Sequence, residues 1–127
     1  MAAIEKIGTK RLVVGAHYGT GEYIIQRVTA IILAIYTLVL LVGILTMTGF
    51  TYAGWKNLFT FTTFGIPVGQ VLASLAMLSL AWHAWIGIRD IWMDYVKPVG
   101  IRLFLLVLTI LWLAGSVVYF VHTLWRN

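Results

Sequence analysis

The sequence is most distinctive for what it has little of: cysteine is absent, proline occurs twice, and charged residues make up only 10% of 127 residues. The lack of cysteine excludes disulfides, thiolate metal ligands and cysteine nucleophiles. Soluble domains contain about 25% charged residues, whereas this chain is 61% hydrophobic and has a mean hydropathy of +0.96. The composition therefore excludes an ordinary soluble domain and indicates an integral membrane protein.

Three long apolar runs account for most of the chain, at residues 23–48, 67–92 and 102–124. A helix needs about 20 apolar residues to cross a hydrocarbon core of about 30 Å, so each run is long enough for one crossing. A polar arm over residues 1–22 precedes them, and its glycines are expected to interrupt regular helix there. We predict an all-α integral membrane protein with three transmembrane helices, forming a single membrane-anchor domain over residues 1–127.

The linker between the first two runs, residues 49–67, contains six aromatic residues and one charged residue, Lys56. Aromatic side chains gather at membrane interfaces. An open strand in contact with lipid would leave backbone groups without hydrogen bonds. We therefore expect an interfacial aromatic belt, with a short helix over residues 51–60 along the membrane surface.

Lysine and arginine are distributed unevenly between the two predicted membrane faces. The N-terminal arm together with Arg27 carries four of the nine, the loop over residues 89–102 carries three, and the linker and the C-terminal end carry one each. Because cytoplasmic segments are enriched in these residues, we predict a cytoplasmic N-terminus and a periplasmic C-terminus. The same rule explains the net charge of +5 with membrane lipid as the neighbour and without nucleic acid.

His83 is the one histidine that the pattern places deep in a predicted span. It precedes Arg89, the predicted membrane edge, by six residues, or about 9 Å at 1.5 Å per residue. Ionisable residues at such depth are costly and mark functional sites. Helical spacing places four residues on one face of this helix: His83, Gly87, Asp90 and Asp94.

Two interpretations of His83 are open at this point. The residue packs and hydrogen-bonds, with Ser79 one turn away as a partner, or it is an axial haem ligand flanked by the small residues Ala84 and Gly87. His122 falls near the opposite membrane face, so it is too far away to share a metal with His83. A haem with two histidine ligands would therefore need its second ligand from another subunit.

The end of the second span carries Asp94 and Tyr95, and each has two interpretations. Tyr95 is an interfacial aromatic residue, or its phenol hydrogen-bonds a quinone carbonyl. Asp94 pairs with Arg89 or Lys97, or it lies beside that quinone. A carboxylate and a hydroxyl near cytoplasmic water suit quinone reduction, which consumes two electrons and two protons.

Arg27 opens the first span and also has two interpretations. It extends to the interface, as basic residues near helix ends do. Alternatively, it lies at the start of a helical face whose other members are the small residues Ala30, Ala34 and Thr37. A helix or a flat cofactor can approach such a face closely. In that position its guanidinium would meet an anionic group.

Three motifs, in order and at compatible spacing, resemble the small hydrophobic anchor subunit of bacterial succinate dehydrogenase. The resemblance runs from about Gly19 to the C-terminus. The motifs are Gln26-Arg27-Val28-Thr29-Ala30-Ile31, His83-Ala84-Trp85-Ile86-Gly87 and Asp94-Tyr95-Val96-Lys97-Pro98.

The resemblance implies a role for each candidate residue. It implies that His83 is one axial ligand of a haem b whose other ligand comes from the larger cytochrome b anchor subunit. It also implies that Tyr95 hydrogen-bonds ubiquinone with Asp94 beside it, and that Arg27 lies near the haem propionates. The implied location is the bacterial cytoplasmic (inner) membrane, which the chain would cross several times.

The resemblance also implies a division of labour. Succinate would be oxidised in a flavoprotein subunit, electrons would pass through an iron–sulfur subunit, and this chain would carry no group for succinate chemistry. Two rival functions are an anchor subunit of a fumarate reductase and a haem-free structural membrane protein in which His83 only packs. A haem absorption band separates the last of these from the others.

Overall fold

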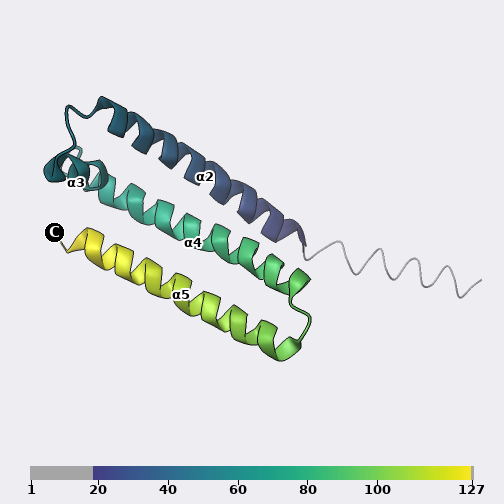
Figure 1. Ribbon diagram of the computed structural model, residues 1–127. Helices are drawn as coiled ribbons and strands as arrows, with labels where there is room; N and C mark the ends of the chain where they lie inside the picture. Colours follow the sequence, from purple (N-terminus) through teal and green to yellow (C-terminus); the bar gives the residue numbers. More distant parts are fainter. Residues whose placement is uncertain (1–18, 127) are drawn as a thin grey trace, which may run out of the picture.

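The computed structural model describes residues 19–126, which form four α-helices and no strand. Three of them, α2 (Gly19–Thr46), α4 (Val68–Tyr95) and α5 (Val99–Trp125), are long and apolar enough to cross a membrane, and α3 (Tyr52–Thr60) is short (Figure 1). The prediction of an all-α protein with three transmembrane helices is confirmed. Most of the predicted arm lies outside the described residues.

The helix bounds differ from the predicted spans at two functionally relevant ends. Helix α2 begins at Gly19 and includes Gly21, so the expectation that these glycines interrupt the helix was wrong. In any helix the backbone N–H groups of the first turn lack intrahelical partners, so glycine costs little helix stability there. Helix α4 continues past residue 92 to Tyr95, because the first obstacle to α-helical backbone is Pro98.

The long helices form a single layer with α4 in the middle (Figure 1). Helix α4 runs antiparallel to α2 on one side and to α5 on the other; a short loop joins α4 to α5, whereas residues 47–67, which include α3, join α2 to α4. In the described part of the chain the buried apolar residues are few: Ala73, Ala76, Ile86 and Leu124. A single layer of helices encloses almost no core, so both broad faces remain free for lipid or for other subunits.

Helices α4 and α5 are joined by neutral hydrogen bonds at both ends. The Trp92 indole Nε1 donates to Thr109 Oγ1 at 3.1 Å near one end. Near the other end, Gln70 Nε2 donates to the backbone oxygen of Leu124 at 3.1 Å. Interhelical hydrogen bonds in membrane proteins contribute about 0.6 to 2 kcal/mol each. This pair of helices therefore has its own fixed register.

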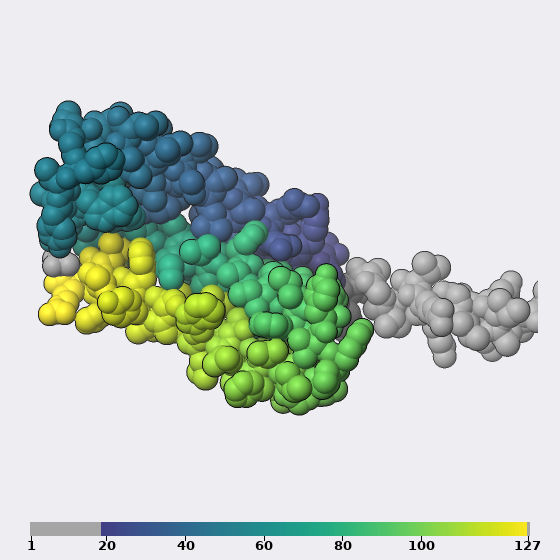
Figure 2. All heavy atoms as spheres, in the orientation of Figure 1, coloured from purple at the N-terminus to yellow at the C-terminus, as the bar shows by residue number. Residues whose placement is uncertain are grey.

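Helix α3 closes one end of the layer by packing on α4 and α2, and a pocket separates it from the C-terminal end of α5 (Figures 1 and 2). Thr51 caps it by accepting a hydrogen bond from the Gly54 backbone N–H at 3.1 Å, and the prediction of a short helix here is confirmed. Gly69 N donates to the Phe61 oxygen at 2.9 Å, and a Cβ at Gly69 would lie 2.7 Å from Phe61 N. Only glycine permits this close approach of the loop to α4.

Candidate haem- and quinone-binding end

His83 hydrogen-bonds across the α2–α4 interface. Its Nδ1 lies 3.1 Å from Thr29 Oγ1, and Thr29 is buried with 8% of its surface exposed. The expected local partner, Ser79, makes no hydrogen bond with His83 within residues 19–126. Ser79 was therefore the wrong partner, because the Thr29 hydroxyl on the facing helix occupies Nδ1.

A second polar pair fixes the register of the same interface. Arg89 makes a two-pronged contact with the Glu22 carboxylate through Nη1 and Nη2, and its Nη2 also lies 3.3 Å from Asp90 Oδ1. Moving from this pair to the Thr29–His83 pair spans seven residues of α2 and six of α4, about 10 Å along each helix axis. The two contacts therefore agree on one antiparallel alignment, and the ion pair restrains the depth of His83.

His83 Nε2 makes no hydrogen bond to any residue in the described part of the chain. Gly87 follows one turn later on the same face, and a Cβ built there would meet nothing within 4 Å. Glycine in a helix costs about 1 kcal/mol relative to alanine, and no contact among residues 19–126 explains it here. An imidazole nitrogen beside an open glycine face fits the requirements of a flat, iron-containing macrocycle.

Asp94 and Tyr95 occupy the last turn of α4, at the same end of the layer as the start of α2 (Figure 1). The side chain of Tyr95 is 81% exposed. Within residues 19–126 no ion pair joins Asp94 to Arg89 or Lys97, since Arg89 binds Glu22 and Asp90 instead. The chain thus presents a carboxylate and a phenol to whatever lies beyond the helix end.

Arg27 lies on a different face of α2 from Thr29. Two residues turn an α-helix by about 200°, so Arg27 points away from the face that packs on α4. Its guanidinium carbon lies 5.0 Å from the centre of the Tyr23 ring, which is within the range of a cation–π contact. The structure therefore brings Thr29 to His83 and leaves Arg27 exposed, on the uncovered side of α2.

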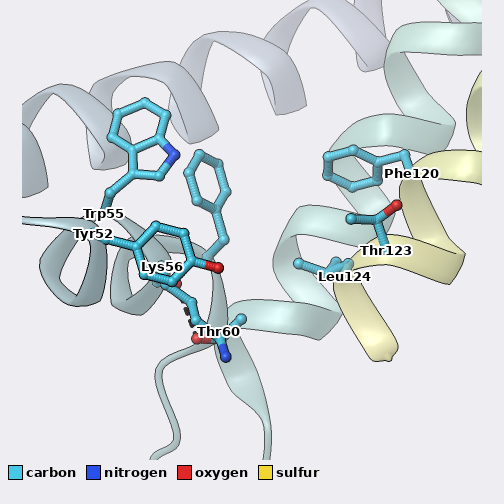
Figure 3. Close-up of a pocket in the computed structure, with 8 residues that line it drawn as sticks. Tyr52, Trp55, Lys56, Thr60, Phe120, Thr123 and Leu124 are labelled. Atoms are coloured by element: carbon cyan, nitrogen blue, oxygen red, sulfur yellow. Dashed lines mark hydrogen bonds between the residues drawn. The ribbon is translucent and has the colours of Figure 1, made fainter. Parts of the chain in front are cut away.

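A pocket at the opposite end does not involve any predicted site residue. It has a volume of about 370 Å³ and is lined by Tyr52, Trp55 and Lys56 of α3 and by Phe120, Thr123 and Leu124 of α5, among others (Figure 3). His122 lies in the last turn of α5, at this same end. Within residues 19–126 no group of three His, Cys, Asp or Glu side chains clusters into a metal site.

Sequence reasoning missed the role of Thr29. The residue stands inside the first motif, but the helical face chosen for α2 was that of Arg27. The face that packs on α4 repeats at intervals of four and three residues and runs through Glu22, Thr29 and Tyr36. A carboxylate and a hydroxyl on one stripe of an apolar helix were the available indication of this interface.

Three apolar helices in one layer, with interhelical polar contacts toward both ends, define a small multi-pass membrane protein. The chain belongs to the family of succinate dehydrogenase/fumarate reductase transmembrane subunits, whose family model matches residues 1–122. It is 34% identical over 107 residues to the succinate dehydrogenase hydrophobic membrane anchor subunit of Coxiella burnetii. That alignment covers 84% of this chain and 89% of the relative.

The resemblance found in the three motifs is therefore confirmed. As an anchor subunit of this family, the chain associates with other subunits of the dehydrogenase.

Proposed function

We propose that this chain is the smaller membrane anchor of a bacterial succinate:quinone oxidoreductase and that His83 is one axial ligand of its haem b. The observation that carries the proposal is the arrangement of His83, whose Nδ1 is held by Thr29 while Nε2 makes no hydrogen bond to the described chain. Haem iron takes a neutral imidazole nitrogen. Gly87 supplies open space one turn away, where a macrocycle needs it.

The second axial ligand comes from the larger cytochrome b anchor subunit. His122 lies at the far end of α5 and is unavailable to His83. The exposed broad faces of the helix layer give that subunit room to pack beside α2 and α4. When bound, haem b supplies a one-electron redox centre within the membrane. Arg27, on the open face of α2, is proposed to meet a haem propionate.

Tyr95 and Asp94 are proposed to form this chain's part of a ubiquinone site. The exposed Tyr95 hydroxyl can donate a hydrogen bond to a quinone carbonyl. The exposed Asp94 carboxylate lies beside it and can hold a proton near water. With the N-terminus cytoplasmic, as the Lys and Arg distribution predicts, this site opens toward the cytoplasm.

The proposed partners divide the chemistry among them. A flavoprotein subunit oxidises succinate, an iron–sulfur subunit conducts the electrons, and quinone is reduced where that subunit meets the two anchors. The absence of cysteine from this chain agrees with placing the iron–sulfur clusters elsewhere. This chain therefore attaches the soluble subunits to the cytoplasmic membrane and supplies His83 and Tyr95.

The test is a reduced-minus-oxidised absorption spectrum of the gently solubilised complex, recorded before and after adding succinate. We expect a b-type haem band, and we expect H83A to abolish the low-spin signal while H122A leaves it unchanged. A colourless wild-type complex, or an unchanged low-spin spectrum in H83A, would refute the ligand assignment. The colourless result would instead favour a haem-free anchor.

A fumarate reductase anchor is the second candidate, because the family description includes both enzymes. The relative from Coxiella burnetii is a succinate dehydrogenase subunit and favours the first. Comparing the rates of succinate oxidation by quinone and fumarate reduction by quinol in the purified complex separates the two.

A further inference from the structure

Thr29 makes three close polar contacts through one hydroxyl group. Its Oγ1 lies 2.8 Å from the backbone oxygen of Ile25, 3.1 Å from that of Gln26, and 3.1 Å from His83 Nδ1. Thr29 and Thr109 are the buried polar residues of the described chain. The Thr29 hydroxyl is therefore largely shielded from solvent, and its hydrogen bonds are made with these three atoms.

The direction of each hydrogen bond follows from counting protons. A threonine hydroxyl has one proton to donate, and backbone carbonyl oxygens only accept. The Ile25 oxygen makes the shortest of the three contacts, at 2.8 Å, and donation to it directs the Thr29 proton away from His83. A lone pair of Oγ1 then faces His83, and in this arrangement Nδ1 is the donor and carries the proton.

The same chain contains a matching arrangement in which the direction admits no alternative. Thr109 Oγ1 donates to the Leu105 oxygen at 2.8 Å and accepts from the Trp92 indole at 3.1 Å. An indole nitrogen can only donate. Thr29, on the other side of α4, has the same two distances: 2.8 Å to the carbonyl oxygen four residues earlier and 3.1 Å to a ring nitrogen of α4. This match supports the same assignment of donor and acceptor.

We propose that Thr29 is a positioning residue that fixes His83 with its proton on Nδ1 and so directs the Nε2 lone pair toward the haem iron. This inference rests on the proposed role of His83 as ligand. The hydrogen bond made by one ring nitrogen selects the nitrogen that binds a metal, and it increases ligand basicity. A more basic imidazole favours ferric iron, so Thr29 lowers the haem midpoint potential.

The test compares three variants of the full complex by potentiometric titration of the haem absorption band. T29V keeps the shape of the side chain and removes the acceptor, whereas T29S keeps the acceptor. T46V is the matched control, because Thr46 is on the same helix and also donates to a carbonyl four residues earlier, Val42 O at 2.9 Å. Within residues 19–126 Thr46 accepts no hydrogen bond from another helix.

We expect T29V to raise the midpoint potential by an amount equivalent to about a tenfold change in preference between the two iron oxidation states. For a one-electron couple this is 59 mV. T29S and T46V should retain the wild-type potential. An unchanged potential in T29V, or an equal shift in T46V, would overturn the role of Thr29.

Two further measurements separate this inference from the proposed function. If H83A keeps its low-spin haem signal, the ligand assignment itself fails; if H83A loses it while T29V keeps the wild-type potential, only the Thr29 inference fails. Should T29V not assemble, infrared difference spectra of the wild-type complex with ¹⁵N-labelled histidine report the protonated ring nitrogen directly. A proton on Nε2 of the ligand histidine contradicts the proposal, and a proton on Nδ1 supports it.

Discussion

The two ends of the helix layer differ in how completely the chain satisfies its own groups. At the α3 end, the loop lies against Gly69 so closely that a Cβ would collide with Phe61, and Gly43 is similarly covered by Leu58. At the other end, the open end, a Cβ added at Gly87 would meet nothing within 4 Å. One end is packed by residues of the chain itself, whereas the other presents groups outward.

The difference shows where this small subunit relies on other molecules. Gly69 at the α3 end is explained by contacts within the described chain, so its substitution is expected to change folding. No contact of the described chain explains Gly87 at the open end, so its substitution is expected to change ligand binding in the assembled complex. Matched pairs of identical residues at the two ends test this separation.

Tyrosine at the two ends gives the largest expected contrast. Tyr95 and Tyr52 are 81% and 80% exposed, so both substitutions to phenylalanine should leave the fold intact. We expect Y95F to lower the rate of quinone reduction about 10²-fold, the usual effect of removing one donor to developing negative charge. Succinate oxidation with a soluble electron acceptor should persist.

Y52F should change neither activity. Equal loss of both activities in Y95F would indicate failed assembly. Unimpaired quinone reduction in Y95F would show that the Tyr95 hydroxyl does not take part in the quinone site.

Substitution of Gly69, at the α3 end, should lower the stability of the fold. G69A places a Cβ 2.7 Å from Phe61 N and 2.9 Å from the Phe59 oxygen, both of which are backbone atoms with little freedom to move. Overpacking of this kind costs about 1 to 3 kcal/mol. Denaturant unfolding of the purified complex in detergent should show the loss, and an unchanged midpoint would mean that the loop moves away from α4 without cost.

Gly87, at the open end, should respond in the opposite way. G87A gains helix propensity of at most about 1 kcal/mol and meets no atom of the described chain. We expect stability to be unchanged or higher while haem content per complex falls, because the new methyl group occupies the face beside His83. G115A is the control, since its Cβ also meets nothing and it lies on α5. Equal haem contents in G87A and G115A would argue against a macrocycle at Gly87.

The fold was largely predictable from the sequence because bilayer thickness sets the length of apolar runs. The three spans and the short helix over residues 51–60 follow from this rule and from aromatic placement. Exact ends did not follow, since the helix at Gly19 and the extension to Tyr95 depend on the first turn and on Pro98. Membrane orientation stays a prediction.

The candidate site was only partly predictable for a physical reason. Periodicity places His83, Gly87 and Asp94 on one face of a helix, but it does not tell which face meets a neighbour. The partner of His83 is Thr29, 54 residues away in the sequence, and local spacing favoured Ser79 instead. The roles of Arg27 and Tyr95 stay predictions because other molecules would complete their surroundings.

The smallest expected effect concerns a polar contact that lies near the open end yet serves only packing. Thr109 accepts the Trp92 indole N–H and joins α4 to α5, so T109V should cost about 0.6 kcal/mol, an average interhelical hydrogen bond. Denaturant unfolding should detect this loss, T109S should restore it, and the haem midpoint potential should not change. This contrast with T29V is the strictest test of the comparison, because both threonines are buried and bonded alike. A potential shift in T109V as large as that in T29V would mean that strain transmitted through α4, rather than a hydrogen bond to the ligand, sets the haem potential.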